Sequence, residues 1–169
     1  MDDPTEQLGE LYRQEGPVIW AYAARHFRDR HDADEVLQET FLAAAQNMTG
    51  LGQASSKRAW LLGIARNTIR HRSRKLRRQR ETGWVEQHAA PKPAHEVDDR
   101  LDRMREAIRQ LPDAQRETLE LRLVEELSYS ETAEVMGIPI GTVRSRLHDA
   151  VRRIRELVSE RTESGIGAP

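Results

Sequence analysis

The sequence predicts an all-α protein made of two small helical domains joined by a linker. Apolar residues recur at three- and four-residue spacing through most of the chain, which is the period of a helix packed on one side. The stretch Glu81–Val97, with Gly83, Pro91, Pro93 and three alanines, interrupts this period and divides the chain. Beyond it, Leu127–Val158 has the pattern of two helices joined by a tight turn. We expect domains at residues 1–80 and 98–160, a linker at 81–97 and a disordered tail at 161–169.

Composition restricts the class of protein further. The 169 residues are 37% hydrophobic and 33% charged, which suits two modest cores better than a single large one. The chain has no Cys, so disulfide bonds and thiolate metal sites are excluded. No apolar run is long enough for a membrane helix, and the acidic N-terminus contradicts a signal peptide. We therefore expect a cytoplasmic protein that makes no contact with a membrane.

Two helices are expected at the start of the N-terminal domain. The first is expected from Thr5 to about Arg28, with a break or bend at Gly16-Pro17, because proline disfavours helical angles at the residue before it. The second is expected over Ala33–Gln46, with Val36, Leu37, Thr40, Phe41 and Ala44 on its buried side. Its other face is acidic and is either solvated or a docking surface for a basic partner helix; it carries Asp34, Glu35, Gln38 and Glu39.

A loop and a basic helix complete this domain. Asn47–Ser56 is rich in Gly and Ser and is expected to be a loop, in which Ser55 or Ser56 can cap the next helix. Trp60 is expected to anchor the core there, in preference to stacking on bases. Every charged residue from Lys57 to Arg80 is positive, whereas a solvated helix usually carries charges of both signs. A phosphate-binding role is therefore favoured for this helix. The positive residues are Lys57, Arg58, Arg66, Arg70, Arg72, Arg74, Lys75, Arg77, Arg78 and Arg80.

The C-terminal domain is expected to begin with two short helices. The first covers Asp98–Leu111 and is stopped by Leu111-Pro112, and the second covers Asp113–Glu125. A third short helix then follows, capped by Ser128 or Ser130 with support from Glu131. Gly137 ends this helix because glycine takes left-handed backbone angles without strain, and Pro139 fits the turn.

The last helix presents two distinct sides. Thr142 is well placed to begin it, and its buried stripe is expected to contain Val143, Leu147, Ala150, Val151, Ile154 and Leu157. The other side suits the DNA major groove, because arginine can bind guanine bidentately and a helix N-terminus can hold a phosphate. An ordinary helical hairpin with a solvated basic face is the alternative. The polar residues are Arg144, Ser145, His148, Asp149 and Arg152, with Arg146 and Arg153 beside them.

Three stretches of the chain together resemble one protein family. DADEVLQETFLAA, WLLGIARNTIRHRSR and LPDAQRETLELRLVEELSYSETAEVMGIPIGTVRSRLH are similar to the bacterial RNA polymerase sigma factors of the extracytoplasmic-function group, group 4 of the sigma-70 family. The resemblance covers about Leu8–Arg80 and Asp98–Val158. Members of this family contain sigma regions 2 and 4, joined by a short linker. The chain is therefore expected to be an alternative sigma factor that directs initiation at specific promoters and helps melt the −10 region.

The resemblance also implies the partners of this chain. It implies binding to core RNA polymerase, through the β′ clamp helices and the β flap, and to promoter DNA, both as duplex and as the melted non-template strand. An anti-sigma factor is a further expected partner, and the free chain is expected to be monomeric. The resemblance implies no catalysis, no cofactor and no metal site in the chain.

Roles for single residues follow from the same resemblance. The −10 loop is expected to line a pocket for a flipped base, and unstacking that base costs a few kcal/mol. Residues implied in core polymerase binding are Asp34, Glu35, Leu37, Gln38, Glu39 and Phe41. Residues implied in −10 binding are Gln53, Ser55, Ser56, Lys57, Arg58, Arg66, Asn67, Arg70, His71 and Arg74. Residues implied in −35 binding are Arg122, Thr142, Arg144, Ser145, Arg146, His148 and Arg152.

Three points remain open at this stage. Asp149 stands where the family often has a basic residue, and it either accepts a hydrogen bond from cytosine N4 or pairs with Arg146, Arg152 or Arg153.

An enzyme is disfavoured, because the histidines lack paired ligand spacing and no nucleophile or phosphate-loop motif is present. A DNA recombinase would need a catalytic domain for which the chain has no room. The stronger alternative to a sigma factor is a transcriptional regulator that binds duplex DNA without polymerase. Such a regulator would need neither the acidic helix at Ala33–Gln46 nor the basic helix that begins at Lys57.

Overall fold

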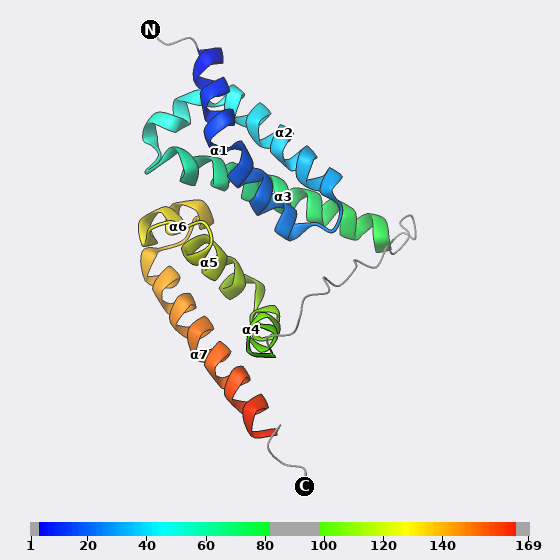
Figure 1. The fold of residues 1–169 in the computed structure, drawn as a ribbon. Helices are drawn as coiled ribbons and strands as arrows, with labels where there is room; N and C mark the ends of the chain where they lie inside the picture. The colour runs from blue at the N-terminus through cyan, green and yellow to red at the C-terminus, as the bar shows by residue number, and fades with distance from the viewer. Residues whose placement is uncertain (1–3, 82–98, 165–169) are drawn as a thin grey trace. The chain divides into compact units, whose positions relative to one another are not determined.

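The computed structural model describes residues 4–81 and 99–164, and in these ranges it contains helices and no strands (Figure 1). The chain divides into two compact units, which we describe separately. The N-terminal unit contains α1 (Pro4–His26), α2 (Arg30–Gln46), the 3-10 helix η1 (Met48–Gln53) and α3 (Lys57–Glu81). The C-terminal unit is built mainly from α4 (Asp99–Arg109), α5 (Asp113–Leu123), α6 (Tyr129–Met136) and α7 (Ile140–Ser164). The predicted all-α fold class with two helical domains is confirmed.

The helix α1 is continuous, so the predicted break at Gly16-Pro17 is wrong. Pro17 lies in the helix interior, where a proline removes a backbone hydrogen bond and costs about 3 kcal/mol. On both sides of it α1 packs against α2 and α3, and its side chains Leu11, Ile19 and Tyr22 are at most 1% exposed. Since burying each such side chain contributes roughly 1.5–3 kcal/mol, their burial together outweighs the cost of the proline.

The helix α2 begins earlier than predicted. Asp29 is its N-cap, and the carboxylate of Asp29 accepts a hydrogen bond from the backbone N–H of His31 at 2.9 Å. This bond satisfies one of the donors that every helix start leaves open, so the helix extends back to Arg30. The face of α2 toward α1 and α3 is buried and includes Val36, Thr40 and Phe41.

The segment predicted as a loop before α3 contains η1. A Cβ atom on Gly50 would lie 3.0 Å from Nε1 of Trp60 and 3.3 Å from the amide nitrogen of Asn47, so this approach favours a glycine. Trp60 therefore packs on η1, in agreement with its predicted role as an anchor. At the end of the segment the hydroxyl of Ser56 accepts a hydrogen bond from the N–H of Ala59 at 3.1 Å, which confirms Ser56 as a cap of α3.

In the C-terminal unit α4 and α5 pack against α7. The core contains Leu111, Leu119 and Ala150, with Ile108, Leu147 and Ile154 packed around them. Val151 was predicted in the buried stripe of α7, but 39% of it is exposed, because it lies at the edge of that stripe.

Two predicted boundaries also change. The helix α5 ends at Leu123, before the predicted Glu125. The helix α7 continues through Ser164, so the prediction of a disordered tail is wrong for residues 161–164. No glycine interrupts the sequence between Gly141 and Gly165, so the helix can extend this far. Residues 82–98 and 165–169, which hold nearly all of the predicted linker and the rest of the tail, lie outside the described residues. None of the described helices has the length and apolar character needed to cross a membrane.

Candidate nucleic-acid interface

The predicted −35 residues lie on a helix-turn-helix whose ends are closed by local hydrogen bonds. Before α6 the hydroxyl of Ser128 accepts from the N–H of Glu131 at 3.2 Å, and the carboxylate of Glu131 accepts from the N–H of Ser128 at 2.8 Å. This reciprocal pair is the predicted capping box. Gly137 has a φ of +64°, as predicted for the residue that ends α6. The helix α7 begins at Ile140, and its first turn is closed by the N–H of Thr142 donating to the carbonyl of Pro139 at 2.9 Å.

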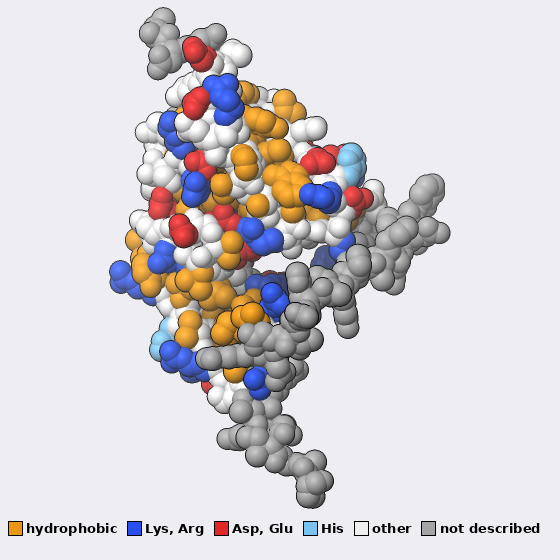
Figure 2. Space-filling view, viewed as in Figure 1, with side chains coloured by type: hydrophobic (Ala, Val, Ile, Leu, Met, Phe, Trp, Pro, Cys, Tyr) orange, Lys and Arg blue, Asp and Glu red, His pale blue; other side chains and the backbone are white. Residues whose placement is uncertain are grey.

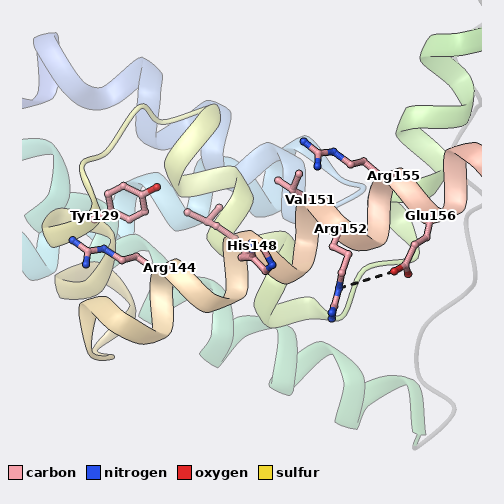
Figure 3. Close-up of a pocket in the computed structure, with 8 residues that line it drawn as sticks. Tyr129, Arg144, His148, Val151, Arg152, Arg155 and Glu156 are labelled. Carbon is pink, nitrogen blue, oxygen red and sulfur yellow. Dashed lines mark ion pairs between the residues drawn. The ribbon is translucent and has the colours of Figure 1, made fainter.

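This geometry places the predicted −35 residues on the first half of α7 and at the end of α5. Arg144, Ser145, His148 and Arg152 are exposed, whereas Thr142, Arg146 and Arg122 are half-buried. An open groove of about 540 Å³ runs along the side of α7, and Val151 lies in it between the polar residues (Figure 3). The groove is lined by Tyr129, Arg144, Leu147, His148, Val151, Arg152, Arg155 and Glu156.

Tyr129, the first residue of α6, was not predicted as a site residue. The guanidinium carbon of Arg122 lies 4.5 Å from the centre of the Tyr129 ring, and that of Arg144 lies 5.6 Å from the same centre. Both distances are within the range of cation–π contacts. The sequence signal for Tyr129 was an exposed aromatic residue directly after the capping serine.

Two other arginines of α7, Arg152 and Arg153, pair with carboxylates. Asp149, whose role the sequence left open, pairs with Arg152 at 3.2 Å. Arg152 also reaches Glu156 at 4.0 Å (Figure 3). Arg153 lies 3.5 Å from Glu156. Among the alternatives for Asp149, the structure therefore contains the ion pair with Arg152.

The predicted −10 residues lie at the end of η1, in the residues before α3 and on α3 itself. Arg66 is 8% exposed and stands four residues after Leu62 and three before Ile69 on α3, and its contact with DNA stays a prediction. Arg58 is tied to α1 by an ion pair with Glu15 at 2.8 Å. Exposed members of the set are Gln53, Ser55, Lys57, Asn67, Arg70, His71 and Arg74, and Ser56 is half-buried.

One arginine of the basic helix is used inside the protein. Arg72 donates to Asp32 of α2 at 2.8 Å, pairs with Glu35, and lies 3.7 Å from Glu39. Burial lowers the pKa of Arg72, but its hydrogen bond and charge interaction with Asp32, together with Glu35, outweigh this effect and raise the pKa above its ordinary value. The positive charge of α3 therefore has two uses: Arg72 joins the helices, and residues such as Arg70 and Arg74 remain at the surface.

The predicted polymerase-binding residues all lie on α2, but they do not share one face. Phe41 is 7% exposed and its ring packs edge-to-face on that of Tyr12, with centres 4.9 Å apart. This agrees with the buried stripe, and the role of Phe41 in docking stays a prediction. Asp34, Gln38 and Glu39 are exposed, and Glu35 and Leu37 are half-buried.

Two residues near this surface were missed by sequence reasoning. Leu42 is 64% exposed and stands four residues after Gln38, so it lies on the same face of α2. The indole N–H of Trp20 donates to the carboxylate of Asp34 at 2.7 Å, and Arg30 stacks on the Trp20 ring at 5.2 Å. On the side of this unit seen in Figure 2, acidic and basic side chains are interspersed, with apolar side chains exposed between them.

Two protein-family models match this chain, one in each half of the sequence. The model described as sigma-70 region 2 matches residues 11–79, and the model described as sigma-70, region 4 matches residues 101–154. These ranges cover most of α1–α3 and most of α4–α7. No group of three or more His, Asp or Glu side chains that could hold a metal ion occurs within residues 4–81 and 99–164.

Individual proteins with similar sequences or structures agree. The ECF RNA polymerase sigma factor SigL of Mycobacterium tuberculosis is 36% identical over 155 residues, which are 89% of this chain and 88% of SigL. The RNA polymerase sigma factor HrpL of Pseudomonas syringae is 36% identical over 92% of this chain and 90% of HrpL. A solved structure of the sigma factor RpoE from Bartonella quintana, in complex with the anti-sigma factor NepR, has a TM-score of 0.67 and 28% identity over 92% of this chain and 96% of RpoE.

Proposed function

Because this chain belongs to the extracytoplasmic-function group of the sigma-70 family, we propose how its two helical units divide promoter recognition. The chain is an alternative sigma factor that binds core RNA polymerase and promoter DNA and directs promoter-specific transcription initiation. In our proposal the C-terminal unit reads the −35 element, and the N-terminal unit binds the −10 element and the polymerase. We take the units as residues 1–80 and 98–160, with residues 81–97 linking them.

The −35 assignment rests on the exposed start of α7, which is the observation that carries the proposal. Arg144, Ser145 and His148 are exposed within the first turns of a helix that follows the turn at Gly137 and Pro139. Such a helix enters the major groove with its N-terminal residues at the base edges, and arginine there binds guanine O6 and N7. We assign Arg144 to base readout and Arg122, Arg146 and Arg152 to phosphates. Thr142 is positioned to support the helix start, because its carbonyl accepts from the hydroxyl of Ser145 at 3.1 Å.

The −10 assignment rests on η1 and the exposed basic face of α3. We propose that Gln53, Ser55 and Ser56 contact a flipped base of the melted non-template strand. The free energy of these contacts must offset the cost of unstacking that base. Lys57, Asn67, Arg70, His71 and Arg74 would contact the backbone of the duplex or of the melted strand. Arg58 and Arg66 have weaker support, because Arg58 is paired with Glu15 and Arg66 is buried.

For polymerase binding we propose the exposed face of α2. Asp34, Gln38 and Glu39 supply its polar part, and the exposed side chain of Leu42 supplies an apolar contact. The half-buried Glu35 and Leu37 flank this face. The expected surface on the polymerase is basic with an apolar site, which is consistent with the β′ clamp helices, and the C-terminal unit would meet the β flap.

Further proposals concern the setting in which the protein works. We propose that it is a cytoplasmic, non-enzymatic regulator that is monomeric when free. An anti-sigma factor is a further proposed partner, supported by the similarity to RpoE, which was solved in complex with NepR. Mixing the purified chain with candidate inhibitors and measuring loss of core binding would test this.

The decisive experiment uses reconstituted holoenzyme. Core polymerase and the purified chain are combined, and run-off transcription is measured on a library of genomic fragments from the source organism. Transcripts that start downstream of a common pair of −35 and −10 sequences, and only when the chain is present, are the expected result. Failure of the chain to bind core polymerase in a pull-down, together with tight binding to duplex DNA by the chain alone, would favour the stand-alone regulator instead.

A further inference from the structure

Two arginines assigned to the −35 element share one aromatic ring. Arg122 comes from the last turn of α5, Arg144 from the second turn of α7, and Tyr129 from the first residue of α6. The guanidinium carbons lie 4.5 Å and 5.6 Å from the ring centre. Figure 3 shows Tyr129 and Arg144 side by side at the end of the groove where α7 begins. Tyr129 is 41% exposed, so the ring belongs to the surface of this unit and not to its core.

These two arginines differ from their neighbours in how they are held. Arg152 and Arg153 form ion pairs with Asp149 and Glu156. Within the described residues neither Arg122 nor Arg144 has an ion pair with a carboxylate, and the buried Nε of Arg122 has no hydrogen-bond partner. The aromatic ring therefore holds this pair, as carboxylates hold Arg152 and Arg153.

The two modes of holding an arginine have different consequences for DNA binding. A carboxylate occupies the N–H edge of the guanidinium, which is the edge that a guanine or a phosphate must bind. Stacking occupies only the flat face and leaves the N–H edge available. An arginine held by stacking can thus be ordered before DNA arrives and still offer its donors, which lowers the entropy lost on binding.

On the basis of the −35 site proposed above, we propose that Tyr129 is a positioning residue for promoter reading. Its ring holds the guanidinium groups of Arg122 and Arg144 in one arrangement, so that base readout by α7 and the phosphate contact from α5 occur together. The ring acts through the two arginines and makes no base contact itself. Loss of the ring should therefore relax sequence preference at the position read by Arg144 and weaken the energetic coupling between the two arginines.

The test compares Tyr129→Ala and Tyr129→Phe in reconstituted holoenzyme. The template is a promoter that the wild-type holoenzyme transcribes, with its −35 element randomised, and the sequences of the transcribed templates give the preference at each position. Tyr129→Phe keeps the ring and should keep the wild-type preference. Tyr129→Ala should reduce the discrimination at one −35 position severalfold, and should do so at the same position as Arg144→Ala.

A second measurement addresses the coupling. Arg122→Ala and Arg144→Ala are made singly and together, with Tyr129 present and with Tyr129→Ala, and transcription from one promoter is measured. With the ring present, the double variant should depart from the product of the single effects severalfold. With Tyr129→Ala, the single effects should multiply. Far-ultraviolet circular dichroism checks that each variant keeps its helical content.

The outcomes separate this inference from the function on which it rests. If Tyr129→Phe weakens transcription from all templates as much as Tyr129→Ala, the hydroxyl contacts DNA directly and the positioning role is overturned. The role is also overturned if Arg144→Ala changes the −35 preference but Tyr129→Ala does not. If Arg144→Ala itself leaves the preference unchanged, then the proposed −35 site is wrong, and the inference fails with it.

Discussion

Arg72 joins the second and third helices of the N-terminal unit. Only 18% of its side chain is exposed, and it faces Asp32, Glu35 and Glu39, which lie along α2. A guanidinium with several donors in a fixed fork is well suited to hold more than one carboxylate. Because its pKa is raised, the stabilising effect of the charged Arg72 is fully present below the pKa of an ordinary arginine and is lost as the pH rises through the raised pKa.

Removal of this arginine should destabilise the protein. We expect Arg72→Ala to lower the free energy of unfolding by about 1–3 kcal/mol, because it leaves partly buried carboxylates without their donor. Urea denaturation followed by circular dichroism measures this change. Arg74→Ala is the matched control, since it removes an exposed arginine of the same helix and should change stability by less than about 0.5 kcal/mol. Equal effects of the two variants would contradict a structural role for Arg72.

At the level of the elements, two glycines where α6 ends and α7 begins have opposite requirements. Gly137 has a φ of +64°, which a side chain disfavours, whereas Gly141 lies in the first turn of α7 with open space around it. Gly137→Ala should therefore destabilise the C-terminal unit by about 1–2 kcal/mol. Gly141→Ala should stabilise it by roughly 0.4–1 kcal/mol, because alanine has less freedom to lose on folding. Thermal unfolding of both variants tests the pair, and shifts in the same direction would argue against this account.

The two faces of α2 predict two separable phenotypes. Glu39 is 52% exposed at its side chain, so Glu39→Lys should reduce core polymerase binding through charge reversal while leaving the fold intact. Phe41 is buried, and Phe41→Ala should cost about 3–5 kcal/mol of stability. Competition with another sigma factor for core polymerase measures the first effect, and denaturation measures the second. Undiminished competition by Glu39→Lys would remove this part of α2 from the interface.

Sequence periodicity predicted the elements well where packing and local capping agree. The capping box of Ser128 and Glu131 and the left-handed Gly137 are short-range features, and the structure confirms both. Pro17 was misjudged because its local cost is visible in the sequence, while the compensating burial of residues such as Tyr22 involves other helices. The partners of Arg58 and Arg72 were not predictable for the same reason, since each pairs with a residue about 40 positions away in sequence.

At the level of the whole molecule, net charge conceals the property that matters for DNA. The chain has a formal charge of −1, yet exposed arginines gather on α3 and on the first half of α7. Binding through such sites releases counterions from DNA, so affinity should fall steeply with salt. The two units can contribute separately to this dependence, because each carries its own basic helix.

The salt dependence distinguishes free from paired arginines. Arg70→Ala or Arg74→Ala should reduce the log–log slope of holoenzyme–promoter affinity against salt by roughly 0.7–0.9 each. Arg58→Ala should reduce it less, because Glu15 already neutralises Arg58. Fluorescence anisotropy with a labelled promoter fragment over a series of salt concentrations gives the slopes. A full change for Arg58→Ala would show that DNA displaces Glu15.

The ion pairs of Arg152 have a consequence for how the protein searches a genome. Asp149 and Glu156 act as counterions that the protein carries itself, so a phosphate that binds Arg152 must first displace a carboxylate. At a random site, attraction to the DNA backbone supplies essentially all of the affinity. The competition between carboxylate and phosphate therefore removes a larger share of the affinity there than at a promoter. A genome offers roughly 10⁶–10⁹ such sites, and each holds sigma factor away from promoters. Carboxylates on the reading helix thus reduce the share of the protein that is stored on DNA it does not transcribe.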